Sequence, residues 1–438
     1  MKLEQLTILL PCHSLEDFTL SRSADEAEQV LCCWSTLWHP ALIDEAQAVP
    51  SWRSAEDPPQ ETDGYLFTIP DCSGDLVPVD WVEKAKASGA AVLHPMQNRR
   101  AMVDAALQHL DTNERTVDPE LVADFHALGY GHLVVELLTR QLRYMSNLDE
   151  ESFKSAVLLA AKEAVNGDVE AAKTQLQSAF DLLHESREYF YPVEAHLLDL
   201  TLVAPTTLGD SIRSELASQF PTNLLVTAEV IQRMAREEPA SLQALTEALA
   251  GNRAALVGGE FAERELPLLS PEAIFHDLSR GIETYEKLLQ ARPMVFGRRK
   301  FGLTPLLPGI LKKLGFSGAL HCTLDDGRFP TGNQSRIQWE GIDGAVLETV
   351  GRVPLDVSRA DAFLRLSERL GDAMDLDHVA TIVLAHWPGQ SSPWYEDLRR
   401  IANYSTVLGT FSTIDDYFEE TGLAGQRTSY SADQYRSP

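Results

Sequence analysis

The sequence predicts an α/β protein whose strands form a largely parallel sheet, either open or closed into a barrel. Ten short apolar runs that end in polar or Gly-rich turns have the composition of strands, and they lie at 7–12, 65–69, 90–94, 196–203, 223–227, 254–258, 293–296, 317–322, 336–339 and 380–386. Amphipathic stretches of helix length lie between several of these runs, at 228–237, 241–250, 270–289 and 304–314. Strands that are apolar throughout and alternate with helices are typical of a parallel sheet covered by helices.

Two of these helices carry clear end signals. Ser270 and Pro271 suit the N-cap and the first turn of the helix at 270–289, and Glu272 places a negative charge near the helix N-terminus, where the helix dipole favours it. The helix at 304–314 is followed by Gly315, a residue that commonly ends helices.

Residues 118–192 show a different pattern, with few Gly or Pro and no convincing strand. The stretches 122–144 and 151–186 are helical over long distances, which predicts a helical subdomain inserted into the α/β fold. The Pro-rich stretch 50–61 (PSWRSAEDPPQE) predicts a loop, and the polar segment 422–438 predicts a frayed tail.

The composition narrows the class of partner. The chain has 438 residues, of which 44% are hydrophobic, enough for one large domain or two moderate ones. With 37 Lys and Arg against 65 Asp and Glu, the formal net charge is −28, and such a surface repels phosphate backbones. Nucleic acid is therefore not expected as a partner, whereas a neutral ligand such as a sugar is compatible with this charge.

The N-terminus and the cysteines bear on location. The apolar run at 6–11 is too short for a signal peptide, and no later segment is expected to cross a membrane. The five cysteines are odd in number and lack metal-binding spacing, so we expect a reducing cytoplasm.

Three motifs lie in order between residues 254 and 350. They read LVGGEFAERE at 256–265, PMVFGRRKFG at 293–302 with PGILKKLGF at 308–316, and WEGIDG at 339–344. Together they resemble the catalytic barrel of the glycoside hydrolase family 38 α-mannosidases. That family has a strand ending in Gly-Gly followed by acidic residues, a strand ending in W-x-P-D-x-F-G, and W-x-G-x-D-G after the next strand.

The resemblance implies an irregular (β/α)7-type parallel barrel with the helical subdomain inserted into it. Residues 1–117 would form the first part of the barrel with N-terminal loops, 118–192 the insertion, 193–421 the remainder of the barrel and 422–438 the tail. The implied function is α-mannosidase-like hydrolysis or binding of a carbohydrate. From the charge and the hydropathy, neither nucleic acid nor a membrane is expected as a partner.

The same resemblance implies a zinc ion, which the family holds through a His-x-Asp pair on the first strand, the nucleophilic Asp and a later His. Asp17 falls at the position of the zinc-binding Asp, but Leu15 stands at the His position and His13 lies two residues early. Arg299 occupies the position of the nucleophile, and a guanidinium can neither attack carbon nor ligate zinc. The zinc ligands that the resemblance implies are therefore incomplete. His13 and Asp17 could instead simply cap the end of the first strand.

Three carboxylates are candidates for catalysis. Asp343 matches an acidic position of the family near the substrate, although Ile-Asp-Gly is also ordinary turn chemistry. Glu263 and Glu265 follow a barrel strand, on the rim where barrel enzymes carry their chemistry. Either could instead pair with Arg264 or Arg299 as a structural ion pair.

The residues expected to bind substrate are Arg298, Arg299, Trp339, His386, Trp387 and His13. A His followed by a Trp at a strand end suits a site that stacks sugar rings and donates hydrogen bonds. Our hypothesis for Arg299 is that its fixed charge partly replaces the metal and balances Asp17, Glu265 or Asp343. Such a site would be free of metal and could accept an anionic sugar.

Two other classes remain open. The departures at Leu15 and Arg299 favour a non-catalytic carbohydrate-binding or scaffolding relative. An enzyme of the family 57 or polysaccharide deacetylase type would instead use Glu260 or Glu265 with Asp325 or Asp326.

Overall fold

The computed structural model describes residues 2–110, 117–140, 147–300, 302–321, 336–377, 379–423 and 427–429. The chain divides into two compact units. Unit 1 comprises residues 1–193, 359–369 and 392–408, and unit 2 comprises residues 194–358, 370–391 and 409–438.

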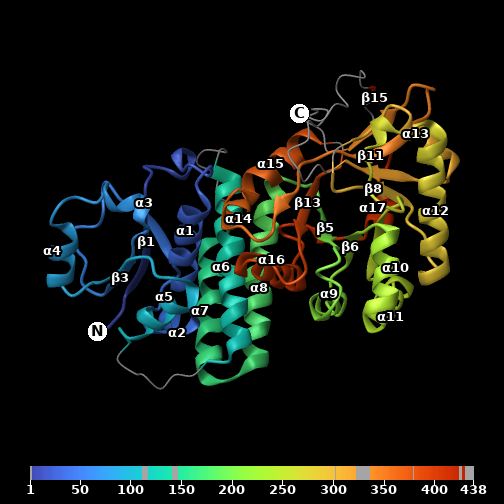
Figure 1. The fold of residues 1–438 in the computed structure, drawn as a ribbon. Coiled ribbons are helices and arrows are strands. Elements are labelled where there is room, and N and C mark those ends of the chain that lie inside the picture. Colours follow the sequence, from blue (N-terminus) through green and yellow to red (C-terminus); the bar gives the residue numbers. More distant parts are fainter. Residues whose placement is uncertain are drawn as a thin grey trace. The chain divides into compact units, whose positions relative to one another are not determined.

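Unit 1 contains a parallel sheet of four strands in the order β2-β1-β3-β4. Figure 1 labels β1 and β3 of this sheet. The strands are β1 (Gln5–Leu10), β2 (Ser51–Ser54), β3 (Tyr65–Thr68) and β4 (Ala91–Leu93). β1 is buried from its second residue on, because it pairs with β2 on one side and with β3 on the other. We expected residues 1–117 to contribute to one barrel with the later strands; in the structure their strands form a sheet of their own.

Helices surround this sheet and extend into a helical layer. They are α1 (Ala24–Leu37), α2 (Pro40–Ala46), α3 (Asp71–Gly74), α4 (Trp81–Ala87), α5 (Arg99–Leu107), α6 (Pro119–Thr139), α7 (Glu150–Asn166), α8 (Val169–Phe190), α14 (Ala360–Leu364) and α16 (Pro393–Tyr404), with the short 3-10 helix η1 (Leu15–Asp17). α1 and α2 pack on β1, and α6 packs against α8 and α16. The predicted helix at 151–186 is two helices, because Gly167 adopts a left-handed conformation (φ 81°) between α7 and α8.

Helix α6 corrects one expectation about membranes. Its 21 residues are long and apolar enough to cross a bilayer, although no segment of that kind was expected. In the structure, 83% of its most apolar window is buried by the rest of the fold. This is the position of a core helix.

Unit 2 is built on a larger sheet, in the order β12-β13-β5-β6-β7-β8-β9-β11-β10-β15. Its strands are β5 (His196–Leu202), β6 (Thr222–Leu225), β7 (Ala254–Gly258), β8 (Val295–Gly297), β9 (Gly318–Leu320), β10 (Arg336–Glu340), β11 (Val346–Val350), β12 (Leu355–Asp356), β13 (Thr381–His386), β14 (Thr410–Phe411) and β15 (Arg427–Ser429). All neighbours pair in parallel except β10 and β11, which form an antiparallel hairpin. β14 pairs with the first residues of β5, beside the place where β6 begins.

The helices of unit 2 are α9 (Asp210–Leu216), α10 (Ala228–Glu237), α11 (Pro239–Ala250), α12 (Pro271–Leu289), α13 (Leu307–Lys313) and α17 (Ile414–Glu420), with the 3-10 helix η3 (Leu266–Leu268). α15 (Leu366–Leu376) begins in unit 1 and ends in unit 2. Ser270 caps α12 by accepting a hydrogen bond from the Ala273 N–H, with Pro271 in the first turn, as the sequence predicted.

The sheet of unit 2 curves strongly around its interior. One apolar cluster unites side chains from β5, β6, β7, β8, β9, β11 and β13. The Tyr417 hydroxyl lies 2.8 Å from the Thr381 Oγ1 of β13, and the Arg336 guanidinium of β10 lies 5.0 Å from the Tyr417 ring centre. Six strands separate β13 from β10, which in a flat sheet would hold them about 34 Å apart. Among the described strands, no pairing closes this curved sheet into a ring.

Each of the ten predicted strands overlaps an observed one, and the four predicted helices of unit 2 are α10 to α13. The structure adds β2, β11, β12, β14 and β15. β2 lies inside the stretch predicted as a Pro-rich loop. The sequence did not predict this strand because its four residues are little buried and form no apolar run. Most of the predicted tail at 422–438 lies outside the described residues.

Candidate functional site

Several predicted site residues meet at one edge of the unit 2 sheet. Glu260 and Glu263 follow β7, Arg298 and Arg299 follow β8, and Trp387 follows β13. These strands run in parallel, so their carboxyl ends lie at the same edge. In α/β folds this edge is where ligands and chemistry are usually found.

Glu260 and Arg298 are buried next to each other at this edge. The Glu260 Oε2 and the Arg298 Nε are 3.5 Å apart, and the side chains are 2% and 3% exposed. Neither oxygen of Glu260 accepts a hydrogen bond from the described residues, whereas the Arg298 guanidinium donates to the carbonyls of Arg264 and Gly302. Burial raises the pKa of the Glu260 carboxyl to about 8, although the positive charge of Arg298 acts to lower this pKa. Glu260 therefore holds its proton at neutral pH.

Arg299 is paired with Glu263, one of the two arrangements that the sequence left open. The Arg299 Nε lies 3.6 Å from the Glu263 Oε1, and the same oxygen accepts a 2.8 Å hydrogen bond from the Arg299 N–H. The Glu263 side chain is 7% exposed and that of Arg299 is 28% exposed. The charge of Arg299 is thus balanced by Glu263, rather than by Asp17, Glu265 or Asp343 as we had hypothesised.

The guanidinium of Arg299 also lies against Trp387, 5.9 Å from the ring centre. Trp387 is half-buried. An aromatic face beside a partly exposed guanidinium gives this edge of the sheet both a stacking surface and hydrogen-bond donors.

Glu265 lies nearby but is exposed, in the same loop. Its carboxylate is close to Gly302, whose positive φ of 117° favours glycine. Arg264, the residue between the two glutamates, pairs at 3.8 Å with Asp277 of α12, which in turn accepts a hydrogen bond from the Phe261 N–H. The loop after β7 is therefore held by ion pairs and by its own backbone.

His386 lies at the end of β13 and is fully buried. Its Nε2 is 3.0 Å from the Asp199 Oδ1 of β5 and 3.4 Å from the Thr201 Oγ1. Both side chains of the His386–Asp199 pair are 0% exposed. Asp199 was absent from the predicted site, although an aspartate within the apolar strand HLLDLTL could have signalled it.

Trp339 is buried in β10, and its indole lies in a T-shaped contact with His321, with 4.3 Å between ring centres. His321 follows β9 and is also buried, and burial lowers the pKa of its imidazole to about 3. Trp339 therefore packs in the core, and its buried ring is not accessible to a ligand.

Asp343 does not converge with Arg299, contrary to our expectation. It lies in the turn between β10 and β11, which precedes β11. β11 is parallel to β9 and β8, so this turn lies at the edge opposite the carboxyl ends. Asp343 is exposed, and its Oδ1 accepts a hydrogen bond from the Ala345 N–H, which is the turn chemistry that the sequence had left as an alternative.

The candidate metal ligands His13 and Asp17 belong to unit 1. The His13 Nε2 lies 3.1 Å from the Glu56 Oε2, and the Asp17 carboxylate accepts a hydrogen bond from the Ser14 hydroxyl. No group of three or more His, Cys, Asp or Glu side chains suited to a metal is found among the described residues. With a guanidinium at the nucleophile position and held by Glu263, these residues do not fit the zinc site of the family. Asp325 and Asp326 lie outside the described residues.

Comparisons with known proteins give only distant likenesses. No protein-family model matches the chain, and no curated protein matches it. An α-mannosidase from Enterococcus faecalis V583 is 13% identical, with 54% of this chain and 30% of that chain covered and a TM-score of 0.41. A 4-α-glucanotransferase from Thermococcus litoralis is 11% identical, with 55% and 42% covered and a TM-score of 0.41. A putative polysaccharide deacetylase from Mycobacterium smegmatis is 15% identical, with 64% and 92% covered and a TM-score of 0.37.

The matched region spans less than half the length of the first two proteins, 30% and 42% respectively. At these scores the likenesses assign no family to the chain.

Proposed function

We propose that unit 2 is a carbohydrate-binding relative of the barrel-type glycoside hydrolases and deacetylases, and that it binds a sugar at the carboxyl edge of its sheet without zinc. The observation that carries the proposal is the contact of Arg299 with Trp387, 5.9 Å from guanidinium to ring centre. Arg299 stands where the resemblance to the family 38 barrel puts the nucleophile, and Trp387 belongs to the His-Trp pair that the sequence analysis expected to stack a sugar ring.

The chemistry of the pair suits a sugar. A tryptophan ring presents an apolar face on which the C–H face of a sugar ring packs, and its edge remains polar. A guanidinium provides several donors in a fixed plane for hydroxyl oxygens. Glu263 holds the Arg299 side chain at the Arg299 Nε. Less side-chain conformational entropy is therefore lost when the remaining guanidinium donors bind a ligand.

We also infer that the curved sheet is barrel-like. The Tyr417 contacts with β13 and β10, and the apolar cluster drawn from seven strands, support an interior that the strands encircle. In such a fold the carboxyl ends of β8 and β13 face each other across the mouth, and the approach of Arg299 to Trp387 is the contact expected there.

A second candidate function is hydrolysis, which one observation favours. Glu260 is a carboxyl group that burial keeps protonated at neutral pH, the state required of a general acid. Against it stands the burial of both of its oxygens, which a leaving group would have to reach.

The test is isothermal titration calorimetry of the full chain with methyl α-mannoside, before and after treatment with a chelator. We expect binding that the chelator leaves unchanged, and a loss of affinity of about tenfold in both Arg299→Ala and Trp387→Ala, which corresponds to about 1.4 kcal/mol. The control is Arg236→Ala, which removes the same charge from an exposed position on α10, where the side chain is 70% exposed.

Unchanged affinity in the two variants, or no binding to the wild type, refutes the proposed site. Hydrolysis of an aryl α-mannoside, measured with and without added zinc, decides the second candidate. Turnover that Glu260→Gln abolishes would establish hydrolysis, and turnover that requires zinc would contradict a metal-free site.

A further inference from the structure

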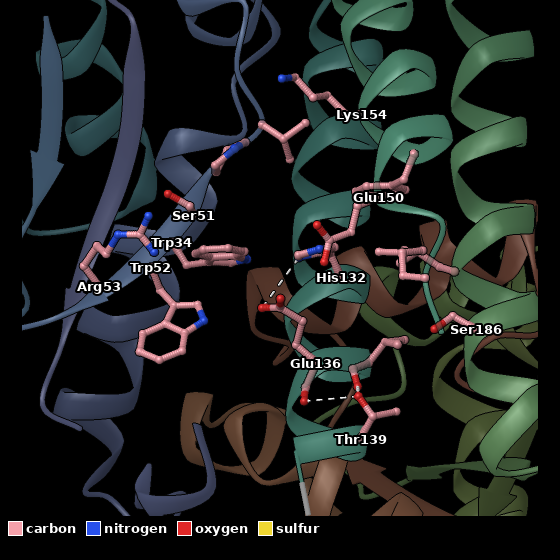
Figure 2. A pocket seen from close by; sticks show the side chains of 16 residues that line it. Trp34, Ser51, Trp52, Arg53, His132, Glu136, Thr139, Glu150, Lys154 and Ser186 are labelled. Atoms are coloured by element: carbon pink, nitrogen blue, oxygen red, sulfur yellow. Dashed lines mark hydrogen bonds and ion pairs between the residues drawn. The ribbon is translucent and has the colours of Figure 1, made fainter. Parts of the chain in front are cut away.

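Unit 1 contains a pocket that the carbohydrate site does not use. Its volume is about 380 Å³, within the range of small-molecule sites, and it lies among residues of β2, α1, α6, α7 and α8 (Figure 2). All of its lining residues belong to unit 1. The pocket is therefore a property of this unit alone.

Aromatic rings form its walls. The imidazole of His132 is stacked between Trp34 and Phe153, with ring centres 6.0 Å and 5.2 Å away and interplanar angles of 14° in both contacts. Trp52 of β2 lies on the same side of the pocket as Trp34, opposite the helix that carries His132 and Glu136 (Figure 2). The indole of Trp34 is held in place because its Nε1 donates a 2.6 Å hydrogen bond to the Gly129 carbonyl.

One carboxyl group lies beside these rings. Glu136 reaches from α6 toward the Trp34 side, as Figure 2 shows. Its Oε2 is buried without a hydrogen bond from any described residue, and the nearest partner is the His132 Nδ1 at 3.9 Å. Burial raises the pKa of the Glu136 carboxyl to about 7 and lowers that of the His132 imidazole to about 4, so the histidine is neutral and cannot compensate the carboxylate.

The other charged lining residues are exposed. They are Arg53, Glu150 and Lys154, two cations and one anion. The charge of Glu150 acts to raise the pKa of both Glu136 and His132. About a third of the Glu136 side chain is itself exposed, so the carboxylate can be reached from the pocket. Glu136 thus offers an acidic group beside aromatic faces, and among the described lining residues neither of the two cations, Arg53 and Lys154, forms an ion pair with it.

We propose that this pocket binds a small organic cation, an ammonium group carried on an apolar or aromatic body, with the ammonium at Glu136 and the body between Trp34 and Trp52. A carboxylate without a hydrogen bond is costly to bury, and a cationic ligand removes that cost. The faces of the two indoles attract the same positive charge.

Other ligand classes fit less well. An anion would be repelled by Glu136 in the interior. A sugar needs several free donors and acceptors, but the Thr139 hydroxyl already donates to the Val135 carbonyl and the Ser51 hydroxyl lies 3.4 Å from that of Thr7. A metal ion would need more ligands than the described residues bring together.

The experiment is calorimetric titration of the full chain with 2-phenylethylammonium, compared with 2-phenylethanol and 3-phenylpropanoate, which keep the ring but are neutral and anionic. We expect only the ammonium compound to bind measurably. Its affinity should fall by about tenfold in Glu136→Gln and in Trp52→Ala, since each removes an interaction worth about 1.4 kcal/mol. The matched control is Glu83→Gln, an exposed acid of α4 outside the pocket.

Glu136→Gln removes a buried charge and should fold, which circular dichroism checks. The proposal is overturned if the alcohol binds as tightly as the ammonium compound, if Glu136→Gln binds like the wild type, or if the wild type binds none of the three. It is equally overturned if Trp52→Ala abolishes binding of methyl α-mannoside, because the pocket would then be a sugar site. Trp387 belongs to unit 2, so Trp387→Ala should not affect binding of the ammonium compound. Failure of this proposal can therefore be distinguished from failure of the proposed carbohydrate site.

Discussion

Replacing Glu260 by glutamine should make the protein more stable at alkaline pH, because burial of this carboxyl group makes its ionisation unfavourable. Its oxygens accept no hydrogen bond from the described residues, and the Arg298 Nε is 3.5 Å away, too far for strong compensation. Burial therefore outweighs the attraction of Arg298, and the pKa rises from 4.5 to about 8.

The sign follows from proton linkage. Between pH 4.5 and about 8 the folded protein keeps a proton that the unfolded chain releases, so stability falls as pH rises through this window. A difference of about 3.5 pH units, at about 1.36 kcal/mol each, corresponds to about 5 kcal/mol above pH 8. Glu260→Gln imitates the protonated acid and does not suffer this loss. We expect equal stability near pH 4.5 and a variant several kcal/mol more stable than the wild type at pH 8.

The assay is urea unfolding followed by circular dichroism at several pH values, with hydrogen exchange of the β7 amides as a local probe of unit 2. Glu229→Gln, an exposed acid of α10, is the control and should leave the pH profile unchanged. The reasoning is refuted if Glu260→Gln loses about 3–5 kcal/mol at pH 7, since that is the loss expected when one partner of an ionised buried pair is removed.

Three further substitutions test the packing, the buried pair and a helix cap. Gly129→Ala should cost about 1–3 kcal/mol in chemical unfolding, because a Cβ there would lie 2.3 Å from the Trp38 Cγ, whereas Gly74→Ala, with no atom within 4 Å, should be close to neutral. His386→Leu should lower the free energy of unfolding by about 3–5 kcal/mol, since it leaves the buried Asp199 without this partner. In a double-mutant cycle, adding Asp199→Leu should recover part of this loss. Ser270→Ala should cost about 1 kcal/mol in thermal or urea unfolding, because the hydroxyl caps α12, and Ser270→Thr should retain most of the stability; an equal loss in both would contradict the cap.

The candidate site shows where sequence reasoning reached its limit. Glu263 and Arg299 were both identified from motifs, and their pairing was one of two arrangements considered. Asp343 was identified from the same kind of motif, but its strand runs against its neighbour, so the turn lies at the other edge of the sheet. A motif reports which residues follow a strand, and strand direction depends on which partner the strand pairs with.

The buried pairs of unit 2 were not predictable from spacing. His386 and Asp199 are 187 residues apart, and Glu260 and Arg298 meet from the ends of two different strands. The pocket of unit 1 likewise gathers side chains between Trp34 and Ser186, three of them on a strand predicted as a loop. Such contacts are made by packing between distant segments, and neither side of the contact carries a local signal.

By itself the sequence determined the α/β class, ten of the described strands and four helices of unit 2. Continuous apolar runs, the cap at Ser270 and the left-handed Gly315 act within a few residues, so strands and helices could be recognised without their partners. Only the tertiary structure decided that β1 pairs with β2 and β3 in a separate sheet, that Arg299 is balanced by Glu263, and that Glu136 lines a pocket with aromatic walls. The reason is that sheet partners and the burial of a charge depend on the whole chain, whereas local propensity depends only on neighbours in sequence.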